Sequence, residues 1–153
     1  MRRDSYRLEV SNVGWFEADG EPRQPSLDVR VDEDPEAVQT RFRHDGDPLR
    51  SGDVDVTFRS LGSGEDEGGV LAIANRLTGE FLLEVNADRG DLRGFVTAAR
   101  RYAERTDDPT RYRVRVLAAG DTVVDLEKRT LLVYAADGEL LRQHSLIPSG
   151  VEI

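Results

Sequence analysis

The sequence predicts an α+β fold, with a mostly antiparallel sheet of about eight or nine strands, one long amphipathic helix packed on one face of the sheet, and one short helix. Two patterns indicate this class. Apolar residues alternate with polar ones in several short segments, as in strands with one face in water, and one long segment repeats its apolar residues at spacings of three and four. A chain of 153 residues is long enough for one core, so we expect a single domain over residues 1–153.

The alternation marks strands with one wet face. Their apolar positions are Tyr6, Leu8 and Val10; Leu27, Val29 and Val31; and Val54, Val56 and Phe58. Two further segments, residues 70–74 and 131–136, are apolar throughout, which is typical of central strands covered on both faces. Residues 81–85 are the expected antiparallel partner of the first of these, connected to it through a turn at Thr78-Gly79.

A hairpin is expected near the end of the chain. Asp137-Gly138 lies between two apolar runs and predicts a two-residue type I′ turn, because both residue types tolerate positive φ. The register that follows pairs Ala136 with Glu139, Tyr134 with Leu141, Leu132 with Gln143 and Leu131 with His144.

Two helices complete the pattern. The long one spans residues 89–105, with Asp88 before it as a capping residue and Pro109 after it as a stop signal. Its apolar stripe consists of Leu92, Phe95, Val96, Ala99, Tyr102 and Ala103. The short helix lies near residues 34–43, because Asp34 stands in the capping position directly before a proline.

The charge composition is unusual for an acidic protein. The chain has 30 acidic residues against 21 basic ones, a formal net charge of −9, and Lys128 is its sole lysine among 20 arginines. This composition is typical of proteins that work in molar salt, where the Debye length is about 3 Å and repulsion between carboxylates is screened. Codon bias in a GC-rich genome is the alternative explanation of the Arg excess, but it does not require the acid excess.

Several function classes lack their signatures. A chain without cysteine has no disulfide or thiolate metal site, which fits a reducing cytoplasm. We expect no secretion signal and no membrane helix. The glycine-rich segment 62–69 contains three acids and no Gly-Lys-Ser/Thr, which favours a loop over a phosphate site. Neither Gly-x-Ser-x-Gly nor His-Glu-x-x-His occurs, and no cofactor is expected.

The segment 89–115 is basic. It contains eight arginines and four acids, a net charge of +4 within a chain of −9. Guanidinium groups in a row can contact nucleic-acid phosphates or the carboxylates of a partner. The candidate contact residues are Arg93, Arg100, Arg101, Arg111, Arg113 and Arg115. Molar salt removes most of the counterion-release gain of phosphate binding. We therefore favour the alternative that arginines are neutralised within the protein, by helix pairs such as Arg100 with Glu104 and by cross-strand pairs.

The histidines offer one candidate metal centre. His44 stands beside Asp45 and Asp47, and an imidazole with two carboxylates can ligate a divalent metal or act as a base. The same residues are also typical of a polar turn, which we favour. His144 has no carboxylate close in sequence, and we interpret it as a half-buried structural residue.

Trp15 and Phe16 are adjacent aromatic residues that follow the first strand. One of them can serve as an interface anchor on the surface. The alternative, which we favour, is that Trp15 covers an edge of the core and Phe16 fills a turn.

A resemblance to a known family is carried by four segments together with the Arg excess. They are residues 75–79 (Asn-Arg-Leu-Thr-Gly), 98–102 (Ala-Ala-Arg-Arg-Tyr), 127–134 and 142–151. The chain resembles, over most of its length, a family of small acidic proteins from halophilic archaea. The family has no assigned activity, so the resemblance implies a cytoplasmic setting in high salt and no catalytic or binding residue.

By elimination, the sequence favours a non-enzymatic, cytoplasmic protein-interaction module that is adapted to high salt. Its partner is unknown: another protein, or a second copy of the chain in a homodimer. Two hypotheses from other classes stay open. One is a nucleic-acid-binding protein that uses the segment 89–115, and the other is a metal-dependent enzyme around His44, Asp45 and Asp47.

Overall fold

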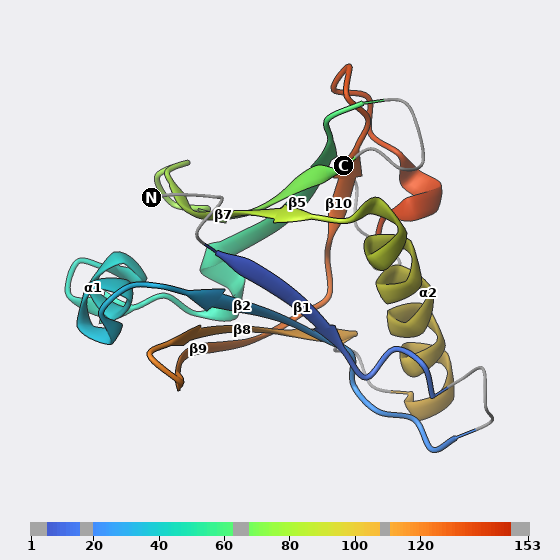
Figure 1. The fold of residues 1–153 in the computed structure, drawn as a ribbon, viewed down its shortest axis with the longest axis horizontal. Coiled ribbons are helices and arrows are strands. Elements are labelled where there is room, and N and C mark those ends of the chain that lie inside the picture. Colours follow the sequence, from blue (N-terminus) through green and yellow to red (C-terminus); the bar gives the residue numbers. More distant parts are fainter. Residues whose placement is uncertain (1–5, 16–19, 63–67, 108–110, 148–153) are drawn as a thin grey trace.

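The computed structural model describes residues 6–15, 20–62, 68–107 and 111–147. Figure 1 shows the arrangement of the elements. In chain order they are β1 (Arg7–Ser11), β2 (Ser26–Val31), α1 (Pro35–Arg41), β3 (Arg43–His44), β4 (Asp47–Pro48), the 3-10 helix η2 (Ser51–Asp53), β5 (Val54–Ser60), β6 (Gly69–Asn75), β7 (Phe81–Ala87), α2 (Arg89–Thr106), β8 (Tyr112–Ala118), β9 (Asp121–Lys128), β10 (Leu132–Tyr134) and the 3-10 helix η3 (Arg142–His144).

The α+β class, with one long and one short helix, is confirmed. The strands belong to two four-stranded sheets, in the orders β1-β2-β8-β9 and β10-β5-β6-β7, rather than to the one sheet expected; β3 and β4 form a separate hairpin. Each large sheet contains one parallel pair, β2 with β8 and β5 with β10, among antiparallel neighbours. These parallel pairs join segments far apart in the chain, which local alternation does not reveal.

The core lies between the two sheets and α2. The inward residues expected on β2 and β5 are buried, and Phe58 of β5 is only 1% exposed. Phe95 of α2 meets Tyr112 of β8 edge to face, with ring centroids 5.3 Å apart, a favoured geometry for aromatic pairs. Helix α2 stands on one side of the sheets and α1 on the opposite side (Figure 1), so the two helices do not share a surface.

Helix α2 ends one residue later than the predicted boundary, at Thr106. Asp88 caps its first turn as expected, because one carboxylate oxygen accepts hydrogen bonds from the backbone N–H groups of Gly90 at 2.7 Å and Asp91 at 3.1 Å. The corresponding cap on α1 is absent. Asp34 makes no side-chain hydrogen bond there, and only its backbone carbonyl accepts from the first turn.

This difference between the two caps predicts different effects of the same substitution. Asp88→Ala removes two capping bonds and is expected to lower the free energy of unfolding by about 1 kcal/mol, a melting-temperature loss of roughly 2–4 °C for a chain of this size. Asp34→Ala is the matched control and should change the melting temperature by less than half as much. Equal losses in the two variants, measured by thermal circular dichroism, would contradict the assignment of the Asp88 cap.

The two uniformly apolar segments differ in position. Strand β6 is central, between β5 and β7, and the expected hairpin with β7 is confirmed, with Gly79 at φ +78° in its turn. The expected central position of residues 131–136 is wrong, because β10 lies at the edge of its sheet. Its residues alternate between buried and half-buried. The apolar residues on its half-buried side therefore did not indicate a central strand.

The predicted register of the last hairpin is also wrong. The backbone N–H of Ala135 donates to the carbonyl of Glu139, which makes a three-residue loop, and Tyr134 lies opposite Leu140. Within that loop only Gly138 has positive φ, whereas a type I′ turn needs it at two successive residues. Beyond the loop, η3 interrupts the pairing, so that Leu131 faces Leu146 and not His144.

Candidate functional site

The structure places six of the eight arginines of the segment 89–115 in two groups. The first group, Arg113 and Arg115, lies on the outward face of β8. Arg115 forms a bidentate pair with Asp28 of β2, with both N–O distances 2.8 Å. Arg113 lies 3.1 Å from a carboxylate oxygen of Asp125 and 2.8 Å from one of Glu127, both on β9. These two arginines are therefore neutralised within the protein, as the favoured alternative proposed.

Asp28 departs from the simple strand pattern, because it is 5% exposed although its position alternates with the apolar ones. Its carboxylate accepts hydrogen bonds from the hydroxyls of Ser26 at 2.6 Å and Ser11 at 3.3 Å. Burial by itself raises the pKa of Asp28, but the bonds and charge of Arg115 and the two serine bonds outweigh it. The net pKa lies below the usual 3.8, and the group is a carboxylate at neutral pH.

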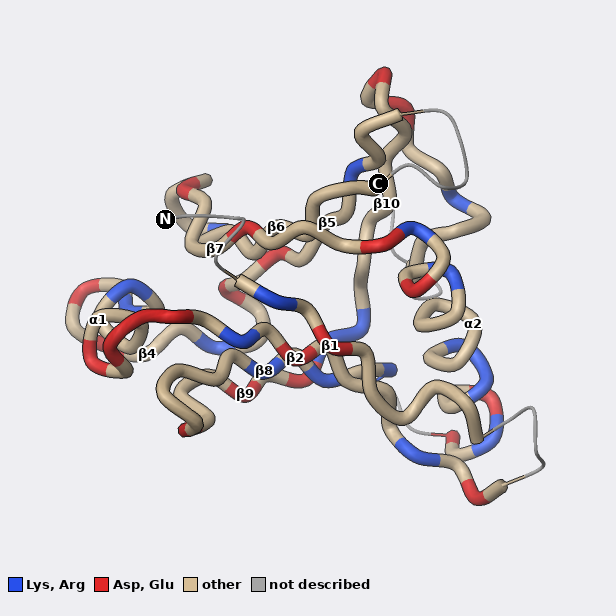
Figure 2. The backbone as a smooth tube through the Cα atoms, viewed as in Figure 1, with Lys and Arg blue, Asp and Glu red and all other residues tan. Residues whose placement is uncertain are grey.

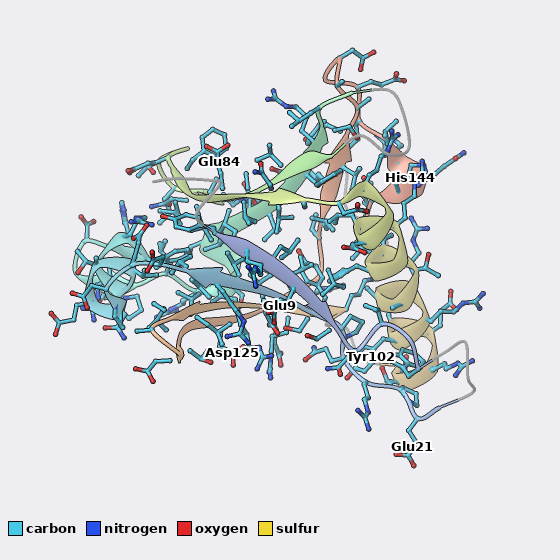
Figure 3. The ribbon with its side chains drawn as sticks, viewed as in Figure 1. Glu9, Glu21, Glu84, Tyr102, Asp125 and His144 are labelled. Atoms are coloured by element: carbon cyan, nitrogen blue, oxygen red, sulfur yellow. The ribbon has the colours of Figure 1, made fainter. Side chains whose placement is uncertain are left out.

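The outward face of the first sheet is thus a network of opposite charges. Arg30 of β2 adds a pair with Glu9 of β1 at 2.9 Å, and both side chains are about half exposed. Figure 3 labels Glu9 and Asp125 on the two outer strands of this sheet. Guanidinium groups held this way are already satisfied by carboxylates, so this face is a poor candidate for a phosphate-binding surface.

The second group consists of Arg89, Arg93, Arg100 and Arg111, and together with Arg129 and His144 it forms what we call the basic surface. Its members come from α2, from η3, and from the residues just before β8 and just after β9. Burial lowers the pKa of His144, and the positive charges of Arg93, Arg89 and Arg100 lower it further. Figure 3 shows His144 beside the first turns of α2, and Figure 2 shows basic positions along this helix.

Arg111 extends the basic surface toward the other end of α2. Burial is the main cause that lowers the pKa of its guanidinium, followed by the positive charges of Arg129 and Arg100. Repulsion of this kind means that like charges are held close together in a chain whose net charge is −9. Positive charge concentrated against the overall sign of a protein is typical of a binding surface for an anionic group.

Arg100 fixes the geometry of the basic surface. One of its terminal nitrogens donates to the backbone carbonyls of Gln143 and Ser145, both at 2.7 Å, and so holds η3 against α2. The expected pair with Glu104 is replaced by a longer contact of Arg101 with Glu104 at 3.8 Å. Arg101 and Glu104 are both largely exposed, and such pairs contribute little to stability.

A small pocket opens at the α2–η3 end of the basic surface. Its apolar lining consists of Phe58, Leu92, Val133 and Leu141, and its polar lining consists of Arg89, Arg93 and His144. The cavity volume of about 10 Å³ is that of one water or one methyl group. Ligand pockets of enzymes are many times larger, so the pocket fits the end of one side chain rather than a substrate.

His44 and Asp47 face each other in the β3–β4 hairpin, and His44 lies 3.4 Å from the carboxylate of Asp45. Asp45 and Gly46 both have positive φ, so this loop is a type I′ turn. It is thus the polar turn that we favoured from the sequence. Among the residues that the structure describes, no three His, Asp or Glu side chains are grouped for a metal ion. His44 belongs to β3, which follows α1 in the chain, whereas His144 lies beside α2 (Figure 3), the helix on the opposite side of the sheets from α1 (Figure 1).

Trp15 is 9% exposed, and its indole N–H donates to the carbonyl of Asn12 at 2.8 Å. The guanidinium of Arg105 lies 5.5 Å from the ring centre. Trp15 therefore covers an edge of the core, as favoured, and offers little surface as an anchor. Phe16 lies outside the described residues. The exposed large apolar side chains of the described part are Leu61, Leu77 and Phe81, which the sequence patterns did not single out.

The whole chain, residues 1–153, matches the model of a family described as a family of unknown function, DUF5793. The chain belongs to the DUF5793 family. No curated protein and no solved structure matches it. No helix in the described part of this DUF5793 member is long and apolar enough to cross a membrane. Membership therefore brings no assigned activity to the basic surface, whose function has to be argued from its chemistry.

Proposed function

We propose that this protein is a non-enzymatic interaction module that binds an acidic segment of a partner protein through the basic surface. The observation that carries the proposal is the proximity of the guanidinium groups of Arg100 and Arg129 to that of Arg111, on a chain of net charge −9. A carboxylate that enters this cluster relieves the repulsion among the guanidinium groups. Each charge-assisted bond that it accepts is stronger than a neutral one.

An acidic protein segment suits this surface better than a nucleic acid does. In molar salt a nucleic acid loses most of the counterion-release gain that drives the binding of its phosphates. Stacking of bases also needs exposed aromatic rings, but Tyr112, next to Arg111, is buried, and Tyr102 of α2 is only partly exposed. A short acidic segment needs only the basic surface itself.

The acid excess supports a working environment of high salt for this module. In molar salt, charges more than about 3 Å apart are screened, so long-range attraction contributes little and direct bidentate contacts carry recognition. Arginine provides such contacts, because its planar fork matches a carboxylate. The nearly complete use of arginine in place of lysine fits this requirement.

The test uses a short fluorescein-labelled peptide of glutamate and glycine, titrated by fluorescence anisotropy at about 0.1 M and about 2 M KCl. We expect saturable binding that Arg111→Gln with Arg129→Gln weakens about tenfold, because two charged contacts are lost. The matched control is Arg43→Glu, which changes the net charge by the same two units. Arg43 is exposed and lies on β3, far from α2, and this variant should bind normally.

A labelled DNA duplex in the same titration separates the two classes of partner. Tighter binding of the duplex than of the peptide, lost in the double variant, would transfer the proposal to nucleic acids. Absence of peptide binding at both salt concentrations, or equal weakening by Arg43→Glu, would overturn it. Light scattering of the free protein then tells whether a second copy serves as the acidic partner.

A further inference from the structure

We propose that a cleft at one end of the first sheet binds a small zwitterionic molecule of the aliphatic amino-acid class. Arg7 and Arg30 bind its carboxylate, and Asp32 binds its ammonium group. None of the described residues that line the cleft belongs to the basic surface, so this inference goes beyond the proposed function and does not rest on it. The chain continues from this end of β2 into α1, on the opposite side of the sheets from α2 (Figure 1).

The size and lining of the cleft suit a small molecule. Its volume is about 380 Å³, and its lining includes Arg7, Arg30, Asp32, Val31 and Leu117. Sites for small molecules have volumes of about 300–1,000 Å³, so a free amino acid fits. Val31 is buried and Leu117 is half-buried, and both offer apolar contact to an aliphatic side chain. The two-residue turn between β8 and β9 forms one wall of the cleft.

The two arginines of the cleft are held side by side. Arg7 of β1 and Arg30 of β2 lie directly opposite each other in the antiparallel register, and both are exposed. Like charges at such positions destabilise a strand pair. Arg30 uses its Nε for a bond to Glu9 at 2.9 Å, whereas the guanidinium of Arg7 has no hydrogen bond or ion pair in the described part of the chain. The charge network of this face therefore leaves Arg7 without a carboxylate, which a ligand can supply through bidentate contacts.

Asp32 places a negative charge in the same cleft. It directly follows β2, is exposed, and has no hydrogen bond or ion pair with any residue that the structure describes. Glu33 also lines the cleft, but its carboxylate accepts a hydrogen bond from Arg41 of α1. Asp32 is thus the carboxylate that remains for a positive group of the ligand.

This combination of charges selects the class of ligand. A simple anion gains contacts with the guanidinium groups but is repelled by Asp32, and a simple cation gains a contact with Asp32 but is repelled by the arginines. A zwitterion satisfies both signs at once, because it carries a carboxylate and an ammonium group on the same carbon. The cleft therefore favours amino acids over inorganic anions and over amines.

The experiment titrates the full chain with three probes that share one aliphatic part. These are leucine, isocaproate, which lacks the ammonium group, and isoamylamine, which lacks the carboxylate. We expect leucine to bind about tenfold more tightly than either analogue, since each analogue lacks one charge-assisted contact. Isothermal titration calorimetry at constant salt concentration measures the three affinities. The proposal is overturned if leucine shows no saturable binding at millimolar concentrations, or if it binds no more tightly than either analogue.

Two variants assign the contacts to their residues. Arg7→Gln should weaken leucine and isocaproate about tenfold without weakening isoamylamine. Asp32→Asn should weaken leucine and isoamylamine without weakening isocaproate. The control is Arg101→Gln, which makes the same change of charge at a largely exposed position of α2 and should leave all three affinities as they are. Equal weakening of all three probes by Arg7→Gln would contradict the assigned contacts.

The melting temperature of Arg7→Gln gives a second readout. Because the substitution removes one of two opposed like charges, the variant should melt no lower than the wild-type protein in the absence of ligand. Leucine should raise the melting temperature of the wild-type protein by mass action, and should raise that of the variant much less. A variant that melts lower and also loses leucine binding would indicate a structural role for Arg7 and overturn its assignment to the ligand.

Discussion

Asp28→Ala is expected to lower the free energy of unfolding by about 3 kcal/mol, which corresponds to roughly 6–12 °C in melting temperature for a chain of this size. The substitution leaves Arg115 without its bidentate partner and removes the acceptor of the Ser26 and Ser11 hydroxyls. Loss of one member of a buried pair costs several kcal/mol because the other charge stays desolvated. Arg115 is about one third exposed, so the expected loss of stability lies near the lower end of the usual range of about 3–5 kcal/mol.

Glu9→Ala is the control for this prediction, because the Glu9–Arg30 pair lies on the same face but is exposed. It should cost less than 1 kcal/mol. Urea unfolding at constant salt concentration measures both variants. A loss for Asp28→Ala no larger than that for Glu9→Ala would show that burial of the pair does not matter.

The same pair has a defined pH dependence. The pKa of Asp28 is lowered in the folded protein, so the carboxylate stabilises the fold at pH values above its unfolded value of 3.8. This contribution is lost as the pH falls below 3.8 through the lower folded pKa. The stability difference between wild type and Asp28→Asn should therefore be constant from pH 5 to pH 7 and shrink below pH 4.

Gly69→Ala is expected to destabilise the protein by about 3 kcal/mol, at the upper end of the usual cost of overpacking. A Cβ at this position would lie 2.2 and 2.5 Å from two ring atoms of Phe58 and 2.6 Å from the carbonyl oxygen of Arg59. The ring belongs to the buried core and the carbonyl belongs to the neighbouring strand, so neither can move away without breaking other contacts.

The neighbouring glycine supplies the control. A Cβ on Gly68 would have one contact, at 3.5 Å from the carbonyl oxygen of Ala87, which is an ordinary packing distance. Gly68→Ala should therefore change stability by less than 1 kcal/mol. Thermal unfolding of the two variants in parallel gives the comparison, and a tolerated Gly69→Ala would contradict the close packing of β6 against Phe58.

Local patterns were sufficient for the helix α2, its Asp88 cap and the β6–β7 hairpin, because these depend on residues close in sequence. They were insufficient where contacts between distant segments of the chain determine the structure. Asp28 alternates like a solvent-facing residue, and only the parallel pairing of β2 with β8 brings it beside Arg115. The edge position of β10 and the type of turn that follows it depend on η3 and Ser145. The hydrophobic periodicity of the sequence does not predict either of these contacts.

The candidate site was predicted in part. The segment 89–115 contains three arginines of the basic surface that were named from the sequence, Arg93, Arg100 and Arg111, and two that lie on the outward face of β8, Arg113 and Arg115. Arg129 and His144 join the surface only through the fold, since they lie in other segments. Their contribution is electrostatic. The order of residues in the sequence does not show which charges from different elements lie close together in the fold.

Lys128 gives the molecule a built-in reporter of unfolding. Its ammonium group donates to the backbone carbonyls of Ser51 and Val54 and so connects β9 of one sheet to the start of β5 in the other. Because Lys128 is the only side-chain amine of the chain, an amine-selective reagent has one side-chain target, and that target is engaged in the folded state. The rate of acylation at Lys128, followed by mass spectrometry, should therefore measure how often the two sheets separate at this seam.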